Sequence, residues 1–247
     1  MSEGKTALVL SAGGMFGAYQ AGAFGVIADR FQFDLVVGTS VGALNGWPIA
    51  GGCSPDELIR RWLDPATGDS LRLVPNPGLR NGWFNPAPLQ KLTSDLMAQY
   101  TPQIPFAMVT LALPRFKTTV FQYPEITAEH LRASSSIPYF LPAVEIHGTR
   151  YLDGGVFEKC PLRVAMDLGA TRIIAVDCLP DMAPRPVRLV LSALRRFRHK
   201  TVIPPGLELT LIEPTAFMGT PQDAVFWKEA NVRRWIDLGR ADAARLL

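Results

Sequence analysis

The sequence predicts an α/β domain of three layers, in which helices cover both faces of a mainly parallel sheet. Two observations carry this prediction. Short, uncharged apolar runs in the first half of the chain lead into glycine-rich turns, and segments of helical character follow those turns. The composition is that of a folded protein, since 48% of the 247 residues are hydrophobic, 19% are charged and no internal repeat appears. We expect a single domain over residues 1–247.

The first elements of the chain alternate between strand and helix. Buried strands are predicted at residues 6–10 and 33–37, and helices at 16–30 and 41–50. Ser54 and Pro55 then indicate the start of a further helix, because serine caps free N–H groups and proline suits the first helical position. This order is typical of parallel strands joined by crossover helices.

The middle of the chain begins with a surface segment at residues 64–85, which is rich in proline, glycine and asparagine and of a kind that often carries function. No linker after it divides the chain into domains. The remaining predicted elements are helices at 86–99, 127–133 and 161–168, strands at 106–113, 118–123 and 172–176, and a hairpin at 144–151 that turns at Gly148.

Charge and cysteine content exclude several classes of protein. The formal net charge of +3 is too small to predict nucleic acid as a partner. Cys53, Cys160 and Cys178 lack the spacing of a disulfide framework or zinc site, which indicates reduced thiols in the cytoplasm. The uncharged stretches at 6–28 and 35–55 contain repeated glycines and polar residues, which excludes membrane-spanning helices. We therefore expect a soluble, unprocessed, cytoplasmic protein.

Gly38, Ser40 and Gly42 form a GxSxG pattern between a predicted strand and a predicted helix. In that setting the pattern is typical of a nucleophile elbow, a tight turn that presents a serine hydroxyl at the end of a strand. Glycines flank the serine because side chains there would collide in so tight a turn. The alternative is a glycine-rich turn needed only for packing, which the strand and helix on either side disfavour.

A serine nucleophile requires a base, and histidine is the usual one. His130, His147 and His199 are the three histidines, and none follows a buried strand, where a catalytic histidine would be presented. The elbow also comes too early in the chain for an α/β-hydrolase with a Ser-His-Asp triad. Asp153 does follow a predicted strand, within YLDGG. Asp-Gly-Gly alone is more often a turn than a catalytic site, but with the early elbow it suggests a Ser-Asp dyad.

The glycine-rich turn after the first predicted strand admits other interpretations. Residues 12–17 approximate the GxGxxG fingerprint of dinucleotide-binding proteins. In those proteins the next strand ends in an acidic residue that binds the ribose, whereas here it leads into Gly38, Thr39 and Ser40. A Walker loop is weaker still, because this turn contains no Gly-Lys-Ser/Thr.

Four sequence blocks between residues 8 and 177 resemble the patatin-like phospholipase family. They are LVLSAGGMFGAYQAG at 8–22, GTSVGALN at 38–45, ASSSIPYFLP at 133–142, and YLDGG at 151–155 with the helix and strand that follow. The resemblance implies a patatin-like α/β/α sandwich and a catalytic dyad of Ser40 and Asp153, with Gly154 and Gly155 completing the aspartate block. It requires neither a metal ion nor another cofactor.

The resemblance also assigns the glycine-rich turn to an oxyanion hole. The N–H groups of Gly13, Gly14 and Met15 would stabilise the oxyanion, with Val41 as a further contributor.

This turn departs from the family pattern at two positions, since Ala12 replaces the first glycine and Phe16 replaces the usual arginine or lysine. We expect Phe16 to tune activity without abolishing it. If the usual cation shapes the loop or attracts anionic substrates, Phe16→Arg should raise activity on phospholipids more than on neutral short-chain esters, because only phospholipids present a phosphate to the new charge.

A basic segment runs from Arg185 to Lys200 and contains six basic residues. As a helix it would carry apolar residues on one side and basic residues on the other, which fits peripheral contact with a membrane surface. The alternative is a helix packed on the sheet with a solvated basic face.

The sequence therefore predicts a serine acyl hydrolase whose partner is a lipid ester or phospholipid. Two alternatives stay open. One is a catalytically weak or silent protein of the same fold that binds lipid or a partner, as the changes at Ala12 and Phe16 suggest. The other is a non-lipid esterase or thioesterase that uses the same dyad.

Overall fold

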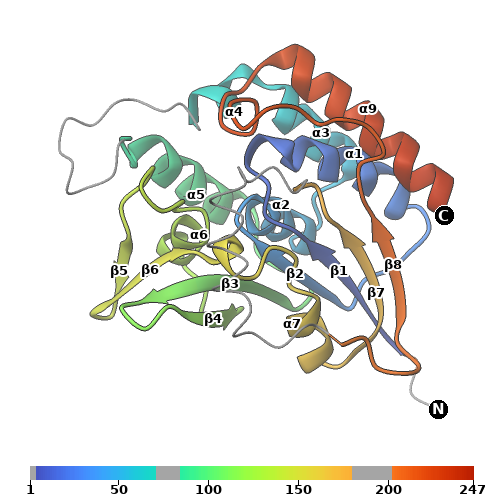
Figure 1. Cartoon of the computed structure of the whole chain (residues 1–247), viewed down its shortest axis with the longest axis horizontal. Helices are drawn as coiled ribbons and strands as arrows, with labels where there is room; N and C mark the ends of the chain where they lie inside the picture. Colours follow the sequence, from blue (N-terminus) through green and yellow to red (C-terminus); the bar gives the residue numbers. More distant parts are fainter. Residues whose placement is uncertain (1–3, 71–83, 180–201) are drawn as a thin grey trace.

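The structure is a computed structural model that describes residues 4–70, 84–179 and 202–247. In these residues one eight-stranded sheet runs through the molecule, with helices on both of its faces (Figure 1). The strand order is β5-β6-β3-β2-β1-β7-β8, and β4 pairs with β3 outside this path. The three-layer α/β/α architecture is confirmed, with a sheet that is parallel in one half and antiparallel in the other.

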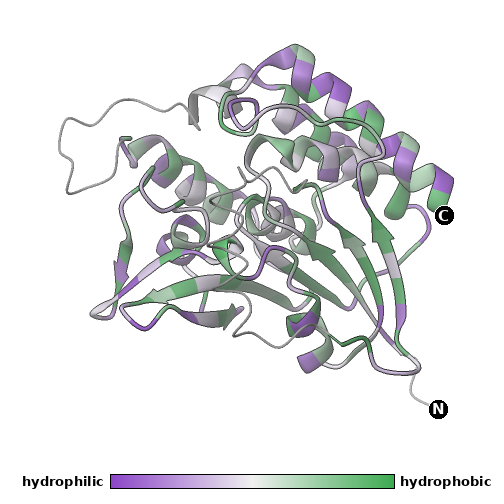
Figure 2. Ribbon diagram, in the orientation of Figure 1, coloured by the Kyte–Doolittle hydropathy of each residue, from purple (hydrophilic) through white to green (hydrophobic). Residues whose placement is uncertain are grey.

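The parallel half of the sheet consists of four strands, of which the two central ones are buried along almost their whole length and the edge strand is partly exposed. It contains β1 (Lys5–Leu10), β2 (Leu35–Thr39), β7 (Ala170–Val176) and β8 (Glu208–Ile212). Leu8 of β1 pairs with Val36 of β2 on one side and with Ile174 of β7 on the other. Figure 2 shows these central strands as continuous hydrophobic runs, which is the pattern expected where helices cover both faces.

The antiparallel half is built on one long strand, β3. Its members are β3 (Phe106–Leu113), β4 (Lys117–Gln122), β5 (Val144–Ile146) and β6 (Thr149–Asp153). Because β4 occupies one edge of β3, the other edge is shared by β2 in its first half and β6 in its second half. Strand β2 is parallel to β3 and β6 is antiparallel to it, so β2 and β6 run toward each other and end at the same point.

The helices form the outer two layers. They are α1 (Gly17–Ile27), α2 (Val41–Ala50), α3 (Pro55–Leu63), α4 (Pro65–Ser70), α5 (Ala87–Gln99), α6 (Ala128–Ser134), α7 (Leu162–Asp167) and α9 (Glu229–Leu246). The sheet face that carries Leu8 and Leu10 is covered by α1, α2, α3, α5 and α9. Helix α7 packs on the opposite face, against Ala7 and Val9. No helix in the described part of the chain is both long and apolar enough to span a membrane.

Two elements in the last part of the chain, β8 and α9, were absent from the sequence prediction. Helix α9 lies along α1 and the two backbones touch (Figure 1). A Cβ atom at Gly22 would lie 2.0 Å from the carbonyl oxygen of Ile236, and one at Gly239 would lie 2.1 Å from that of Tyr19. Glycine on each helix therefore permits this close crossing.

The start of the predicted surface segment at 64–85 also differs from expectation, because residues 65–70 form the short helix α4. Its residues 71–83 lie outside the described part of the chain. Ser54 and Pro55 begin α3 as predicted, and the Ser54 side chain accepts a hydrogen bond from the Glu57 N–H.

Candidate active site

Ser40 lies in a sharp turn between the end of β2 and the start of α2. Its φ of 57° and ψ of −126° are strained for a residue with a side chain, as a nucleophile elbow requires. A Cβ atom at Gly38 would lie 2.3 Å from the Gly42 carbonyl oxygen, and one at Gly42 would lie 2.2 Å from that of Leu10. The two flanking glycines are thus required by contact between backbones, as predicted for an elbow.

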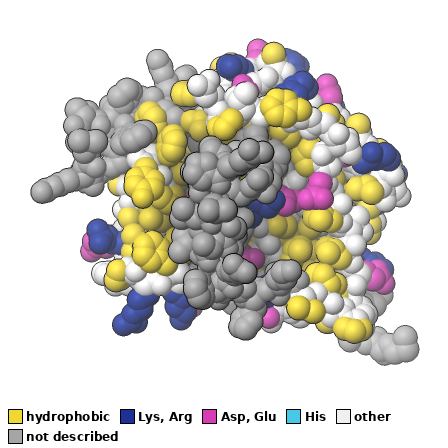
Figure 3. Space-filling view, viewed as in Figure 1, with side chains coloured by type: hydrophobic (Ala, Val, Ile, Leu, Met, Phe, Trp, Pro, Cys, Tyr) yellow, Lys and Arg dark blue, Asp and Glu magenta, His cyan; other side chains and the backbone are white. Residues whose placement is uncertain are grey.

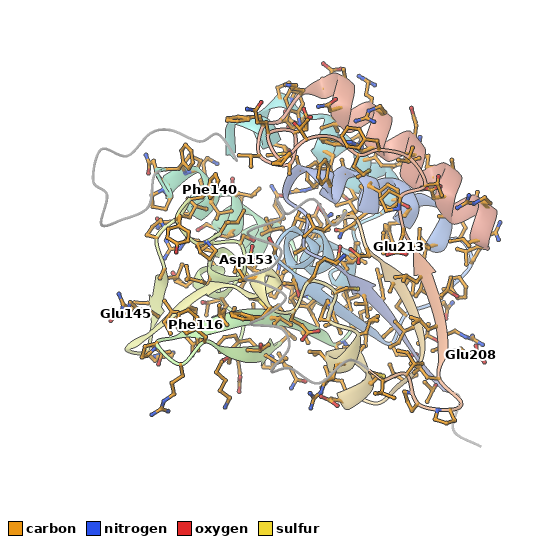
Figure 4. The ribbon with its side chains drawn as sticks, viewed as in Figure 1. Phe116, Phe140, Glu145, Asp153, Glu208 and Glu213 are labelled. Atoms are coloured by element: carbon orange, nitrogen blue, oxygen red, sulfur yellow. The ribbon has the colours of Figure 1, made fainter. Side chains whose placement is uncertain are left out.

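Asp153 is the last residue of β6, and β3 brings it to Ser40. Thr39 pairs with Val109 and Asp153 pairs with the next residue, Thr110, so the ends of β2 and β6 meet on adjacent positions of β3. The Ser40 hydroxyl lies next to the Asp153 carboxyl and lowers its pKa, as a hydrogen-bond donor does. Figure 4 shows Asp153 near the centre of the molecule. Ser40 and Asp153 lie far apart in sequence, and pairing of their strands with β3 brings them together.

The environment of Asp153 changes its acidity. The side chain is buried, and burial raises the pKa of its carboxyl from 3.8 to about 6 because the charged form loses water. Hydrogen bonds from Ser40 and from the Gly155 N–H, at 2.7 Å, act in the opposite direction and favour the carboxylate. The group is therefore ionised at neutral pH and is a stronger base than an exposed aspartate.

Gly154 and Gly155 allow the chain to turn directly after Asp153. A Cβ atom at Gly154 would lie 2.7 Å from the Val109 carbonyl oxygen, and one at Gly155 would lie 2.5 Å from the Cβ of Ala12. The second contact places Ala12, the first residue of the predicted oxyanion loop, against the aspartate turn.

The predicted oxyanion loop is the turn between β1 and α1. Among the described residues, the N–H groups of Gly13, Gly14 and Val41 have no hydrogen-bond partner. The Met15 N–H is engaged, because it donates to the carbonyl oxygen of Ala224 at 2.9 Å. The structure thus leaves three of the four predicted donors free, and the prediction for Met15 requires correction.

A buried chain of amide side chains fixes this loop to the elbow helix. The Gln20 Nε2 donates to the Ser11 carbonyl at 2.7 Å, and the Asn45 Nδ2 donates to the Gln20 Oε1 at 2.9 Å. The Trp62 Nε1 in turn donates to the Asn45 Oδ1 at 3.0 Å. The sequence motifs do not predict these roles, although an uncharged polar residue within an apolar helix is the signal for such a network.

An apolar pocket of about 170 Å³ opens beside Ser40. Figure 3 shows hydrophobic side chains gathered on the side of the molecule where α5 and β5 lie. The pocket is lined by Gly14, Met15, Ser40, Val41, Leu44, Asn85, Pro88, Leu89, Ser135, Ile137, Phe140, Leu141, Ala224 and Val225. A serine beside a base, free N–H donors and an apolar cavity together suit attack on an acyl group.

Phe16 has a different role from the one the sequence suggested. Its side chain is fully buried, and its ring packs edge-to-face on Trp235 of α9 with 4.9 Å between the centroids. An arginine at this position would lie in the core and not beside a substrate phosphate. The burial of Phe16 therefore removes the reason for expecting Phe16→Arg to raise activity on phospholipids.

The two histidines that the structure describes, His130 and His147, lie away from the pocket. His130 is buried, and its Nδ1 accepts a hydrogen bond from the Thr127 N–H at 3.1 Å at the start of α6. His147 lies exposed in the hairpin turn, and neither side chain lines the pocket. His199 and the basic segment from Arg185 to Lys200 fall outside the described residues.

Within the described residues, no group of His, Cys, Asp and Glu side chains is arranged to hold a metal ion.

Comparison with solved structures gives two matches, of which the one to VipD supports the fold. The structure of VipD from Legionella pneumophila matches with a TM-score of 0.56 at 12% identity, covering 99% of this chain and 66% of that one. The type III effector protein ExoU matches with a TM-score of 0.46 at 13% identity, covering 98% of this chain and 52% of that one.

Comparison of sequences identifies relatives of this chain. The uncharacterized protein YjjU of Escherichia coli (strain K12) is 29% identical over 197 residues, covering 72% of this chain and 53% of YjjU. This chain thus spans about half the length of that relative. Residues 8–166 match the model of the family described as patatin-like phospholipase, and they include the elbow, the oxyanion loop and the aspartate turn. The chain belongs to the patatin-like phospholipase family.

Proposed function

We propose that the protein is a serine lipid acyl hydrolase, a carboxylic ester hydrolase in which Ser40 is the nucleophile and Asp153 is the base. The observation that carries this proposal is the meeting of the strained Ser40 elbow and the buried Asp153 carboxyl at adjacent positions of β3, with Ser40 lining an apolar pocket. Membership of a lipid hydrolase family supports the same reaction class.

The reaction proceeds in two steps through an acyl-enzyme. Asp153 accepts the Ser40 proton while the Ser40 Oγ attacks the ester carbonyl carbon. The N–H groups of Gly13, Gly14 and Val41 stabilise the oxyanion, and the alcohol leaves with the proton from Asp153. A water molecule then attacks the acyl-enzyme and gives a proton to Asp153. Collapse of this second intermediate returns that proton to the Ser40 Oγ and releases the fatty acid.

The shape and lining of the pocket favour a lipid acyl chain. Leu44, Leu89 and Leu141 contribute apolar walls that a fatty acyl chain would contact. Ile137 lies at the pocket and is partly exposed, and nearby Tyr139 is 82% exposed. These residues support peripheral contact with a lipid surface, to which the basic segment at 185–200 would add charge attraction.

Covalent labelling tests the nucleophile. A fluorophosphonate probe should label the protein at Ser40, and Ser40→Ala should abolish the label while the far-ultraviolet circular dichroism spectrum stays unchanged. Asp153→Asn should lose most turnover of p-nitrophenyl esters, because an amide cannot accept the proton. Labelling at another serine, or full activity of Asp153→Asn, would overturn the dyad.

A second candidate function is lipid binding without turnover, which the engaged Met15 N–H favours because one predicted oxyanion donor is occupied. The wild-type protein distinguishes the two functions. Absence of both probe labelling and ester turnover in a folded sample would support the binding protein. Faster turnover of acyl thioesters than of lipid esters would instead favour a thioesterase.

A further inference from the structure

Three consecutive serines begin at the last residue of α6, and the first of them, Ser134, contacts the elbow. Ser134 is fully buried, and its Oγ accepts a hydrogen bond from the Ser40 N–H at 2.9 Å. The same hydroxyl donates to the Val109 carbonyl oxygen at 2.8 Å. One side chain therefore satisfies a donor of the elbow and an acceptor of β3.

The Val109 carbonyl lies where the two halves of the site meet. Val109 pairs with Thr39, and the next residue of β3 pairs with Asp153. The Asp153 N–H also donates to the carbonyl oxygen of Ser136, at 3.0 Å. The turn from Ser134 to Ser136 thus holds the backbones of both Ser40 and Asp153.

The elbow needs such support because Ser40 has a positive φ, a conformation that persists only where the surrounding structure enforces it. Without the Ser134 hydroxyl, the Ser40 N–H and the Val109 carbonyl would both lose a buried partner. The turn would relax, and the Ser40 Oγ would move relative to Asp153.

We propose that Ser134 is a positioning residue, which holds the Ser40 hydroxyl in hydrogen-bond geometry with Asp153 through the Ser40 backbone. The catalytic consequence rests on the proposed function of the dyad, whereas the structural consequence does not.

Kinetics of Ser134→Ala test the catalytic consequence. We expect kcat to fall by roughly 10- to 100-fold with KM nearly unchanged, because the acyl pocket is intact while the nucleophile is displaced. The acid limb of the pH profile should also move to higher pH, since the hydrogen bond from Ser40 helps to keep Asp153 ionised. Ser134→Thr keeps the hydroxyl and should retain more activity than Ser134→Ala.

Ser54→Ala is the matched control. It also removes a serine hydroxyl that accepts a backbone N–H, at the start of α3 and away from the pocket. It should lower the melting temperature without changing kcat or the pH profile. Wild-type kcat and an unshifted acid limb in folded Ser134→Ala would overturn the proposal. So would equal kcat losses in folded Ser134→Ala and Ser134→Thr with no shift of that limb.

Amide hydrogen exchange tests the structural consequence without using activity. The Ser40 N–H should exchange faster in Ser134→Ala than in the wild type, while the Ser54→Ala variant should leave it protected. Unchanged protection would overturn the inference even if the wild type is active. If the Ser40 N–H exchanges faster in Ser134→Ala but the wild type proves inactive, the positioning contact stands and only the proposed function is rejected.

Discussion

At the scale of single residues, the burial of Asp153 sets the expected pH dependence. The carboxyl must be ionised to accept the Ser40 proton, and burial raises its pKa to about 6. We therefore expect kcat/KM for a p-nitrophenyl ester to rise as pH increases through about 6 and to level off above it. Initial rates at subsaturating substrate concentration, measured below and above that pH, define this acid limb of the pH profile.

His130 is the control for this assignment, because a buried histidine also titrates near neutral pH or below. Burial lowers the pKa of His130, and the residue lies at the start of α6. His130→Gln should leave the acid limb in place. A limb that disappears in His130→Gln would contradict the role given to Asp153.

Phe16 gives a second prediction at this scale. Phe16→Arg places a charge in the core against Trp235, so the free energy of unfolding should fall by about 3 kcal/mol or more. Phe16→Leu keeps an apolar side chain and should lose only about 1 to 2 kcal/mol. Denaturant unfolding of both variants measures the difference. An arginine variant as stable as the leucine variant would show that the side chain reaches solvent.

At the scale of elements, contact between α1 and α9 gives a matched pair of glycine substitutions. Gly22→Ala would place a Cβ atom 2.0 Å from the Ile236 carbonyl oxygen, so we expect a loss of about 2 kcal/mol or more in the free energy of unfolding. Gly25→Ala lies on the same helix, where the nearest atoms would be 3.9 Å away. It should be neutral or stabilise the protein by about 1 kcal/mol, because alanine favours helix over glycine.

Thermal and denaturant unfolding of the two variants check this pair. Similar effects of Gly22→Ala and Gly25→Ala would mean that the helices do not touch at their backbones.

The elements predicted best are those that the protein buries most completely. The predicted ranges 41–50 and 106–113 coincide with α2 and β3, because each is an apolar run followed directly by glycine or proline. Strand β8 is partly exposed along its length and gave no such run. Helix α9 does carry a readable signal, since Val232, Trp235 and Ile236 recur at helical spacing.

At the scale of the whole molecule, the candidate site joins segments from most of the chain. The motifs predicted the identities of Ser40 and Asp153, since a glycine-flanked turn after a strand is a local pattern. The contact of Met15 with Ala224 and that of Ser134 with Ser40 depend on tertiary packing, which local patterns do not specify. The family match ends at residue 166, yet Ala224 lines the pocket. The last part of the chain is thus part of the site.

Two helices begin at this site, α1 after the oxyanion loop and α2 after Ser40, and neither has an acidic residue in its first turn. Helix N-termini attract anions, and the fatty acid released by the reaction is itself an anion. The fatty acid product should therefore inhibit the protein. The ionised carboxyl of Asp153 repels this anion and so weakens the inhibition. Octanoate should compete with substrate more strongly at about pH 5.5 than at about pH 7.5, because Asp153 is mostly protonated at the lower value.

Octanamide is the neutral control, and its inhibition constant should hardly change over the same interval. An inhibition constant for octanoate that is equally insensitive to pH would mean that the bound product does not lie close to the Asp153 carboxyl. If the product is retained, turnover in a lipid surface will depend on how quickly the fatty acid anion leaves as well as on how quickly the ester bond is cleaved.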